Sequence, residues 1–213
     1  MDVDNVHAIR GPITSTVTME VPFPLSSWES FYVIVGSSGA ALTGLQFVVV
    51  TLVADSTIKT STREIDAFAT PTVVHFCVVL FIAAALSAPW PSMFGPDLLL
   101  AGCGLYGVGY VATVVRRARV TQYHPVAEDW IWHVLLPATA YASLIASAAI
   151  LSRHAELSLF IAAGVSVLLL FIGIHNAWDT VTYVATMRAS NADPAVQASP
   201  AAPSQPPPPP TPT

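Results

Sequence analysis

The chain has 213 residues, of which 54% are hydrophobic and only 10% are charged, and its formal net charge is −5. A soluble domain usually has about a quarter charged residues, so this composition argues against an aqueous fold. The negative net charge argues against a nucleic-acid partner, and two cysteines in different apolar segments argue against a disulfide-rich scaffold.

The N-terminal segment, residues 1–27, is polar and expected to lie outside the cell. It lacks the basic start and the continuous apolar run of a secretory signal peptide. We therefore expect the first helix to remain in the mature protein.

Five apolar windows of at least 18 residues contain no Asp, Glu, Lys or Arg. A bilayer core requires about 20 apolar residues of α-helix, so each window can nearly or fully span it. The sequence predicts an all-α integral membrane protein in the lipid bilayer, with a five-transmembrane-helix bundle within residues 28–188. The expected helices cover residues 29–54, 71–90, 97–115, 130–151 and 157–183.

Small residues recur within two of these helices. Gly36, Ala40 and Gly44 form a stripe in the first helix, and four glycines fall within residues 102–109 of the third. Small residues let backbones approach closely in lipid, so these faces predict helix contacts, either within the chain, in a homo-oligomer or with a partner membrane protein. Gln46 predicts an interhelical hydrogen bond.

Prolines divide the chain at two places. Three prolines and a glycine within residues 89–96 predict a tight turn, which makes the second and third helices an antiparallel hairpin. Nine of the eighteen prolines lie in residues 194–213. Residues 189–213 are therefore expected to be a disordered Pro-rich tail, and a solubilising spacer is favoured over a ligand for a Pro-recognition groove.

Basic residues predict the orientation. Lys and Arg sum to six on one side of the predicted membrane and two on the other. The positive-inside rule then predicts an inner-membrane protein with its N-terminus outside and its C-terminus in the cytoplasm.

Three histidines lie within predicted membrane segments, where ionisable residues are costly and therefore most often functional. His75 and His133 begin the second and fourth helices and His175 ends the fifth, so the alternation of helices predicts all three at the cytoplasmic interface. Carboxylates accompany them: Asp179 lies four residues after His175, Asp129 lies four before His133, and Glu128 is adjacent.

Pro137 adds a further feature to the fourth helix. It has no amide hydrogen, which frees the carbonyl group of His133 and predicts a kink beside that imidazole.

Several kinds of chemistry suit these six residues. Histidine and carboxylate groups suit a transition metal, although no HExxH, HxxxH or CxxC spacing is present. Two histidines from separate helices are also candidate haem ligands, and a proton relay is a further alternative. The structural alternative is an interfacial hydrogen-bond network that ties the helices together.

The sequence thus predicts a membrane protein with a site for a metal or another small polar ligand. The alternative is a non-catalytic accessory or scaffold subunit in which the polar cluster is structural. A membrane-embedded hydrolase ranks below both, because no G-x-S-x-G pattern occurs.

Overall fold

The computed structural model describes residues 24–54, 62–120 and 127–192, and every regular element in these ranges is helical. This confirms the predicted all-α fold for the described part of the chain. The expectations for most of residues 1–27 and 189–213 lie outside it. The elements are η1 (Pro24–Trp28), α1 (Glu29–Ala54), α2 (Thr62–Leu86), α3 (Phe94–Val120), α4 (Ala127–Trp130), η2 (Ile131–Leu135), α5 (Leu136–Leu151) and α6 (Ala155–Ala192).

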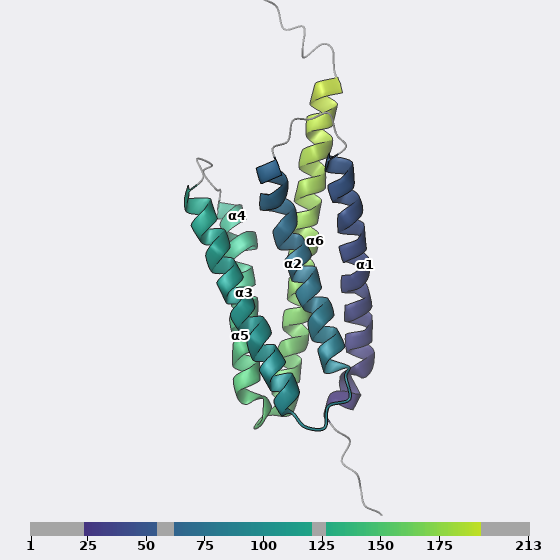
Figure 1. Cartoon of the computed structure of the whole chain (residues 1–213), viewed down its shortest axis with the longest axis vertical. Helices are drawn as coiled ribbons and strands as arrows, with labels where there is room; N and C mark the ends of the chain where they lie inside the picture. Colours follow the sequence, from purple (N-terminus) through teal and green to yellow (C-terminus); the bar gives the residue numbers. More distant parts are fainter. Residues whose placement is uncertain (1–23, 55–61, 121–126, 193–213) are drawn as a thin grey trace, which may run out of the picture.

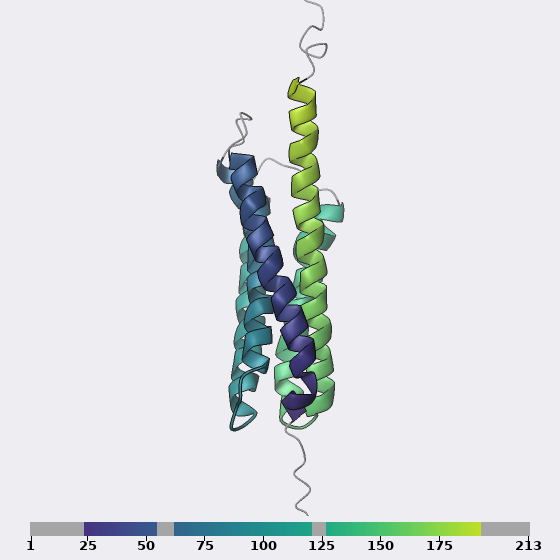
Figure 2. The ribbon, with the colours of Figure 1, turned by 90° about the vertical axis from the view of Figure 1, so that its right-hand side faces the viewer.

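The long helices run up and down along one axis (Figure 1). The most extensive helix–helix contacts are between α3 and α5, α1 and α2, α5 and α6, and α2 and α6. Helices α2 and α6 therefore connect α1 to the α3–α5 pair, and α6 projects beyond the other helices at one end (Figure 2).

Four helical stretches of the described residues are long and apolar enough to cross a membrane, and α2 has a shorter apolar stretch, Thr70–Leu86. Large apolar side chains such as Phe47, Leu105 and Phe171 are exposed on the outside of the bundle. An outer surface of this kind is expected where lipid, rather than water, surrounds the helices. The four stretches are Leu25–Thr51, Phe94–Arg117, Ala127–Leu151 and Ala155–Tyr183.

The helix ends differ most from the sequence-based expectation at both ends of α2 and at the end of α6, while α3 begins three residues earlier and ends five residues later than expected. Helix α2 begins at Thr62 rather than at residue 71 and continues through Pro71. Helices in membranes tolerate proline because neighbouring groups satisfy the freed backbone carbonyl. Helix α6 continues to Ala192, since neither glycine nor proline interrupts it before Pro194.

The helix that carries His133 widens into a π-helical turn just before Pro137. There the backbone N–H of Leu136 donates to the carbonyl of Ile131, five residues earlier. The sequence predicts an irregularity here from the missing N–H of Pro137, and the structure shows it as a π-helical turn, a feature frequent at functional sites.

Glycines set the close approach of α1 to α2. A Cβ atom at Gly36 would lie 2.8 Å from the Cβ of Ala83, and one at Gly39 would lie 3.3 Å from the carbonyl oxygen of Phe76. A Cβ at Gly44 would have no neighbour within 4 Å. The predicted stripe therefore makes a close contact within the chain at Gly36, and Gly39 adds a second contact position, whereas Gly44 makes none within the described residues.

Reciprocal serine hydrogen bonds join α5 to α6. The Ser147 hydroxyl donates to the carbonyl oxygen of Ser158, and the Ser158 hydroxyl donates to that of Ser147, each at 2.8 Å. Both serines are fully buried. Buried polar groups with complete partners rigidify the contact between two helices. The serine pair therefore stabilises the end of the bundle at which α5 turns into α6.

Candidate functional site

His75 lies in the interior of the bundle, where a tyrosine of α5 meets it. Its Nδ1 atom is 2.8 Å from the hydroxyl oxygen of Tyr141, and only 2% of the His75 surface is exposed. The Tyr110 ring of α3 stands edge-on to the imidazole, with ring centroids 6.5 Å apart. In this histidine–tyrosine cluster one buried hydrogen bond joins α2 to α5, and a ring contact adds α3.

His175 lies at the surface of α6, covered by an aromatic side chain from η2. The Trp132 indole stacks on its imidazole with centroids 3.7 Å apart and an interplanar angle of 15°. The Nε2 atom lies 3.1 Å from Oδ2 of Asp179. This contact lacks the alignment of a hydrogen bond, so Nε2 is buried without a hydrogen-bond partner. We call these three residues the His–Asp site.

The remaining predicted site residues lie on the same helical run as Trp132. His133 donates from Nδ1 to the backbone carbonyl of Asp129, four residues earlier, at 3.2 Å. Asp129 is half-buried and Glu128 is exposed. Glu128 and Asp129 belong to α4 and His133 to η2, all within four positions of Trp132 in the sequence.

The structure thus divides the predicted cluster into two parts. His75 belongs to the interior histidine–tyrosine cluster, whereas His175 and Asp179 share one face of α6. Within residues 24–54, 62–120 and 127–192, no group of three or more His, Cys, Asp and Glu side chains is placed to hold a metal ion. The predicted His–carboxylate spacing does bring two potential ligands together.

Two features of the His–Asp site determine its chemistry. The stacked indole restrains the imidazole plane, and the neighbouring carboxylate favours a positively charged or hydrogen-bond-donating partner. An imidazole nitrogen and a carboxylate oxygen are also both suitable ligands for Zn²⁺ or a similar metal. The arrangement is therefore suited to binding a small polar species between two side chains of one helix.

The sequence does not predict the aromatic neighbours of these histidines, which are Trp132, Tyr110 and Tyr141. Each lies on another helix, so spacing along one helix carries no signal for the contact.

Two buried amide side chains, Asn176 and Gln46, have polar atoms without a hydrogen-bond partner, and each residue is only 2% exposed. The interhelical hydrogen bond expected from Gln46 is not made by its Nε2 atom.

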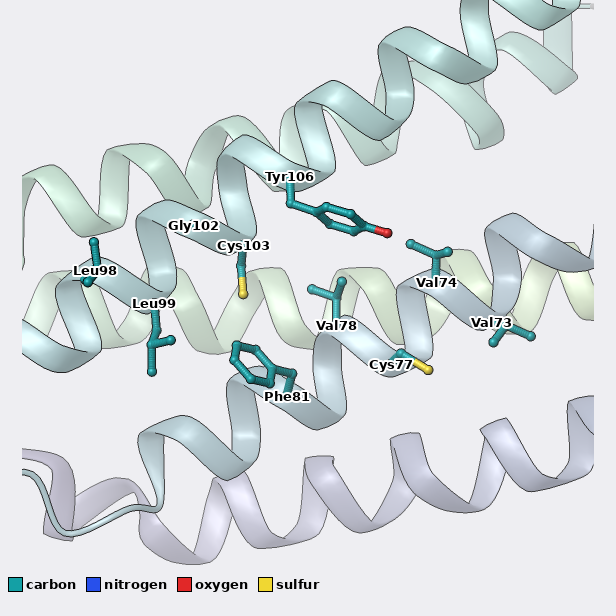
Figure 3. Close-up of a pocket in the computed structure, with 10 residues that line it drawn as sticks. All are labelled: Val73, Val74, Cys77, Val78, Phe81, Leu98, Leu99, Gly102, Cys103 and Tyr106. Carbon is teal, nitrogen blue, oxygen red and sulfur yellow. The ribbon is translucent and has the colours of Figure 1, made fainter.

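A cavity of about 410 Å³ separates α2 from α3 (Figure 3). The two helices follow each other through a turn, as predicted, but they contact each other less closely than α3 contacts α5. Cys77 and Cys103 both line this cavity and are free thiols. Its other walls are apolar except for the Tyr106 hydroxyl, so the cavity suits a hydrocarbon chain better than a polar ligand.

Comparison with protein-family models, curated proteins and solved structures finds no match to this chain.

Proposed function

We propose that the chain is an inner-membrane protein that crosses the bilayer five times, with its N-terminus outside and its C-terminus in the cytoplasm. Four apolar stretches and the alternating direction of the long helices support this topology. Arg116 and Arg117 end the apolar part of α3, at the end of the bundle to which the positive-inside rule assigns the cytoplasm. The His–Asp site lies toward the same end, in the later part of α6.

A topology experiment tests this proposal. We expect an epitope tag before Met1 to be reached by antibody in intact spheroplasts, and a tag after Thr213 only after permeabilisation. The reason is that an odd number of crossings separates the two termini. A tag in the α5–α6 turn at Ser152–His154, which is exposed, serves as a second external marker. Termini on one side would contradict five crossings, and a reversed pattern would contradict the orientation.

The function that the geometry supports best is the binding of a divalent transition-metal ion or another small polar ligand at the His–Asp site. The observation that carries this proposal is the buried Nε2 atom of His175, 3.1 Å from Asp179 Oδ2 and without a hydrogen-bond partner. A nitrogen and an oxygen at this separation are able to bind one ion together, as adjacent ligands at about 2.0–2.2 Å from the metal. His133, Asp129 and Glu128 are the nearest predicted ligands on the neighbouring helix.

Titration with Co²⁺ and Zn²⁺ tests the site. We expect the purified full-length protein to bind one equivalent of metal, and His175→Ala or Asp179→Asn to weaken binding at least 10-fold, because each removes one of two ligands. His154→Ala is the matched control, since His154 is exposed in the α5–α6 turn. Calorimetry and Co²⁺ absorption give the readout. Equal binding by the wild type and the His175→Ala variant would contradict the metal proposal.

A non-catalytic accessory or scaffold subunit is the second candidate function. It is favoured by Gly102 and Gly109 of α3, which are exposed and whose added Cβ atoms would have no neighbour within 4 Å. Such positions allow another membrane helix to approach closely. The same titration separates the two functions, because a scaffold predicts no metal binding that depends on His175. A visible absorption spectrum of the purified protein tests the haem alternative.

A further inference from the structure

A second cavity, of about 240 Å³, lies where α1, α2 and α6 meet. From its geometry we infer that it binds a lipid-soluble carbonyl compound of the quinone class, held by the side-chain amide of Gln46. This binding site, here the amide cleft, is separate from the His–Asp site. It does not depend on the function proposed above.

Gln46 supplies the polar group of the cleft. It is the one amide of the cleft lining, where the only other side-chain donor is the indole N–H of Trp178, and its Nε2 atom is buried with no hydrogen-bond partner. A primary amide carries two N–H donors, and a donor left unpaired in an apolar interior is unfavourable. An acceptor oxygen on a bound molecule would remove this penalty, which is why the ligand is assigned a carbonyl group.

The burial of Gln46 strengthens this assignment. Only 2% of the Gln46 surface is exposed, so water does not replace the missing partner of its amide. Buried polar groups without a partner are rare in folded proteins unless another molecule completes the hydrogen bonds. Asn176 of α6 also has an unpaired buried amide, but it faces away from Ala177 and the other α6 residues that line the cleft, so it carries no part of this inference.

The remaining walls define the rest of the ligand. Phe76 and Trp178 contribute aromatic rings, the other lining side chains are aliphatic, and no charged residue lines the cleft. Leu45 and Trp178 are strongly exposed at its rim, so the cleft opens on the outer surface of the bundle. A flat apolar ring system with a carbonyl group, entering from the bilayer, matches an apolar wall with a single amide donor.

The observations favour this occupant over two others. A transmembrane helix of a second copy would contact the exposed rim, but Gln46 is too buried to meet it. A charged, water-soluble ligand would find no opposite charge in the cleft. The larger cavity between α2 and α3 offers no comparable group for a carbonyl oxygen, because no unpaired buried side-chain donor lines it.

Binding of two probes to the full-length protein in phosphatidylcholine nanodiscs tests the inference. The probes are 2,3-dimethyl-1,4-naphthoquinone, whose substituted ring carbons do not add the free thiols of the chain, and 2,3-dimethylnaphthalene. They share a two-ring skeleton but differ in the carbonyl groups. Equilibrium dialysis against empty nanodiscs corrects for partition into lipid. We expect the quinone to bind more tightly than the hydrocarbon, and Gln46→Leu to weaken quinone binding by about 3- to 10-fold, the effect of one hydrogen bond. Hydrocarbon binding should not change.

Thr51→Val is the matched control in the same helix. The Thr51 hydroxyl is exposed and already donates to the carbonyl of Phe47 at 2.8 Å, so its loss should leave quinone binding unchanged. Gln46→Met, which keeps the side-chain length, replaces Gln46→Leu if that variant does not fold. Unchanged quinone affinity in the folded Gln46 variant, or equal wild-type affinity for both probes, would overturn the inference.

Discussion

Replacing Gly104 by valine is expected to lower the thermal stability of the bundle strongly, whereas the same change at Gly102 should have little effect. A Cβ atom at Gly104 would lie 2.9 Å from the carbonyl oxygen of Tyr141 and 3.0 Å from the amide nitrogen of Ile145. These are backbone atoms of α5, so they are unable to move aside unless α3 and α5 separate. Overpacking of this kind costs about 1–3 kcal/mol or more.

Gly102→Val is the matched control, because a Cβ at Gly102 would have no neighbour within 4 Å among the described residues. Thermal unfolding of both variants in the same detergent, followed by circular dichroism, gives the comparison. Two variants with the same midpoint would show that α3 and α5 do not approach each other as closely as the structure has them.

Tyr141→Phe is expected to destabilise the protein by about 1–3 kcal/mol, the cost of leaving a buried polar group without its partner. The hydroxyl of Tyr141 lies 2.8 Å from Nδ1 of His75, and both side chains are almost completely buried. Phenylalanine keeps the ring that packs against Gly107 and removes only the hydroxyl. The loss therefore measures the hydrogen bond rather than the packing.

Tyr106→Phe makes the same chemical change at an exposed position and should alter stability little, since Tyr106 is 59% exposed. Chemical or thermal unfolding of the two variants under identical conditions gives the difference. A loss at Tyr106 equal to that at Tyr141 would argue against a stabilising contact with His75. A double variant that also replaces His75 by leucine should recover part of the loss, because no unpaired imidazole then remains.

Local patterns were informative wherever both partners lie on one helix. The four-residue spacing of His175 and Asp179 predicts a shared face, and the structure places their side chains in contact at 3.1 Å. Pro137 predicts an irregular backbone, and a π-helical turn precedes it. These effects arise from geometry within a few residues, so they can be inferred without knowing which helices are neighbours.

Contacts between helices were not predictable in the same way. The membrane supplies little hydrophobic preference among helix faces, so composition alone does not distinguish Gly104, which packs on α5, from Gly102, which does not. Nor does it pair His75 with Tyr141, 66 positions away. The helix order around the bundle determines both, and that order depends on the packing of all the helices together.

The sequence by itself determined the helical class of this protein and the placement of its long apolar segments, because the exclusion of charge from lipid acts on each segment separately. The exclusion of Asp, Glu, Lys and Arg from these segments follows from the same constraint. Only the tertiary structure decided that His75 is buried against tyrosines, that Trp132 covers His175, and that the amide of Gln46 has no partner. Each of these depends on which helix faces meet, and faces are chosen by side-chain fit between segments distant in the chain.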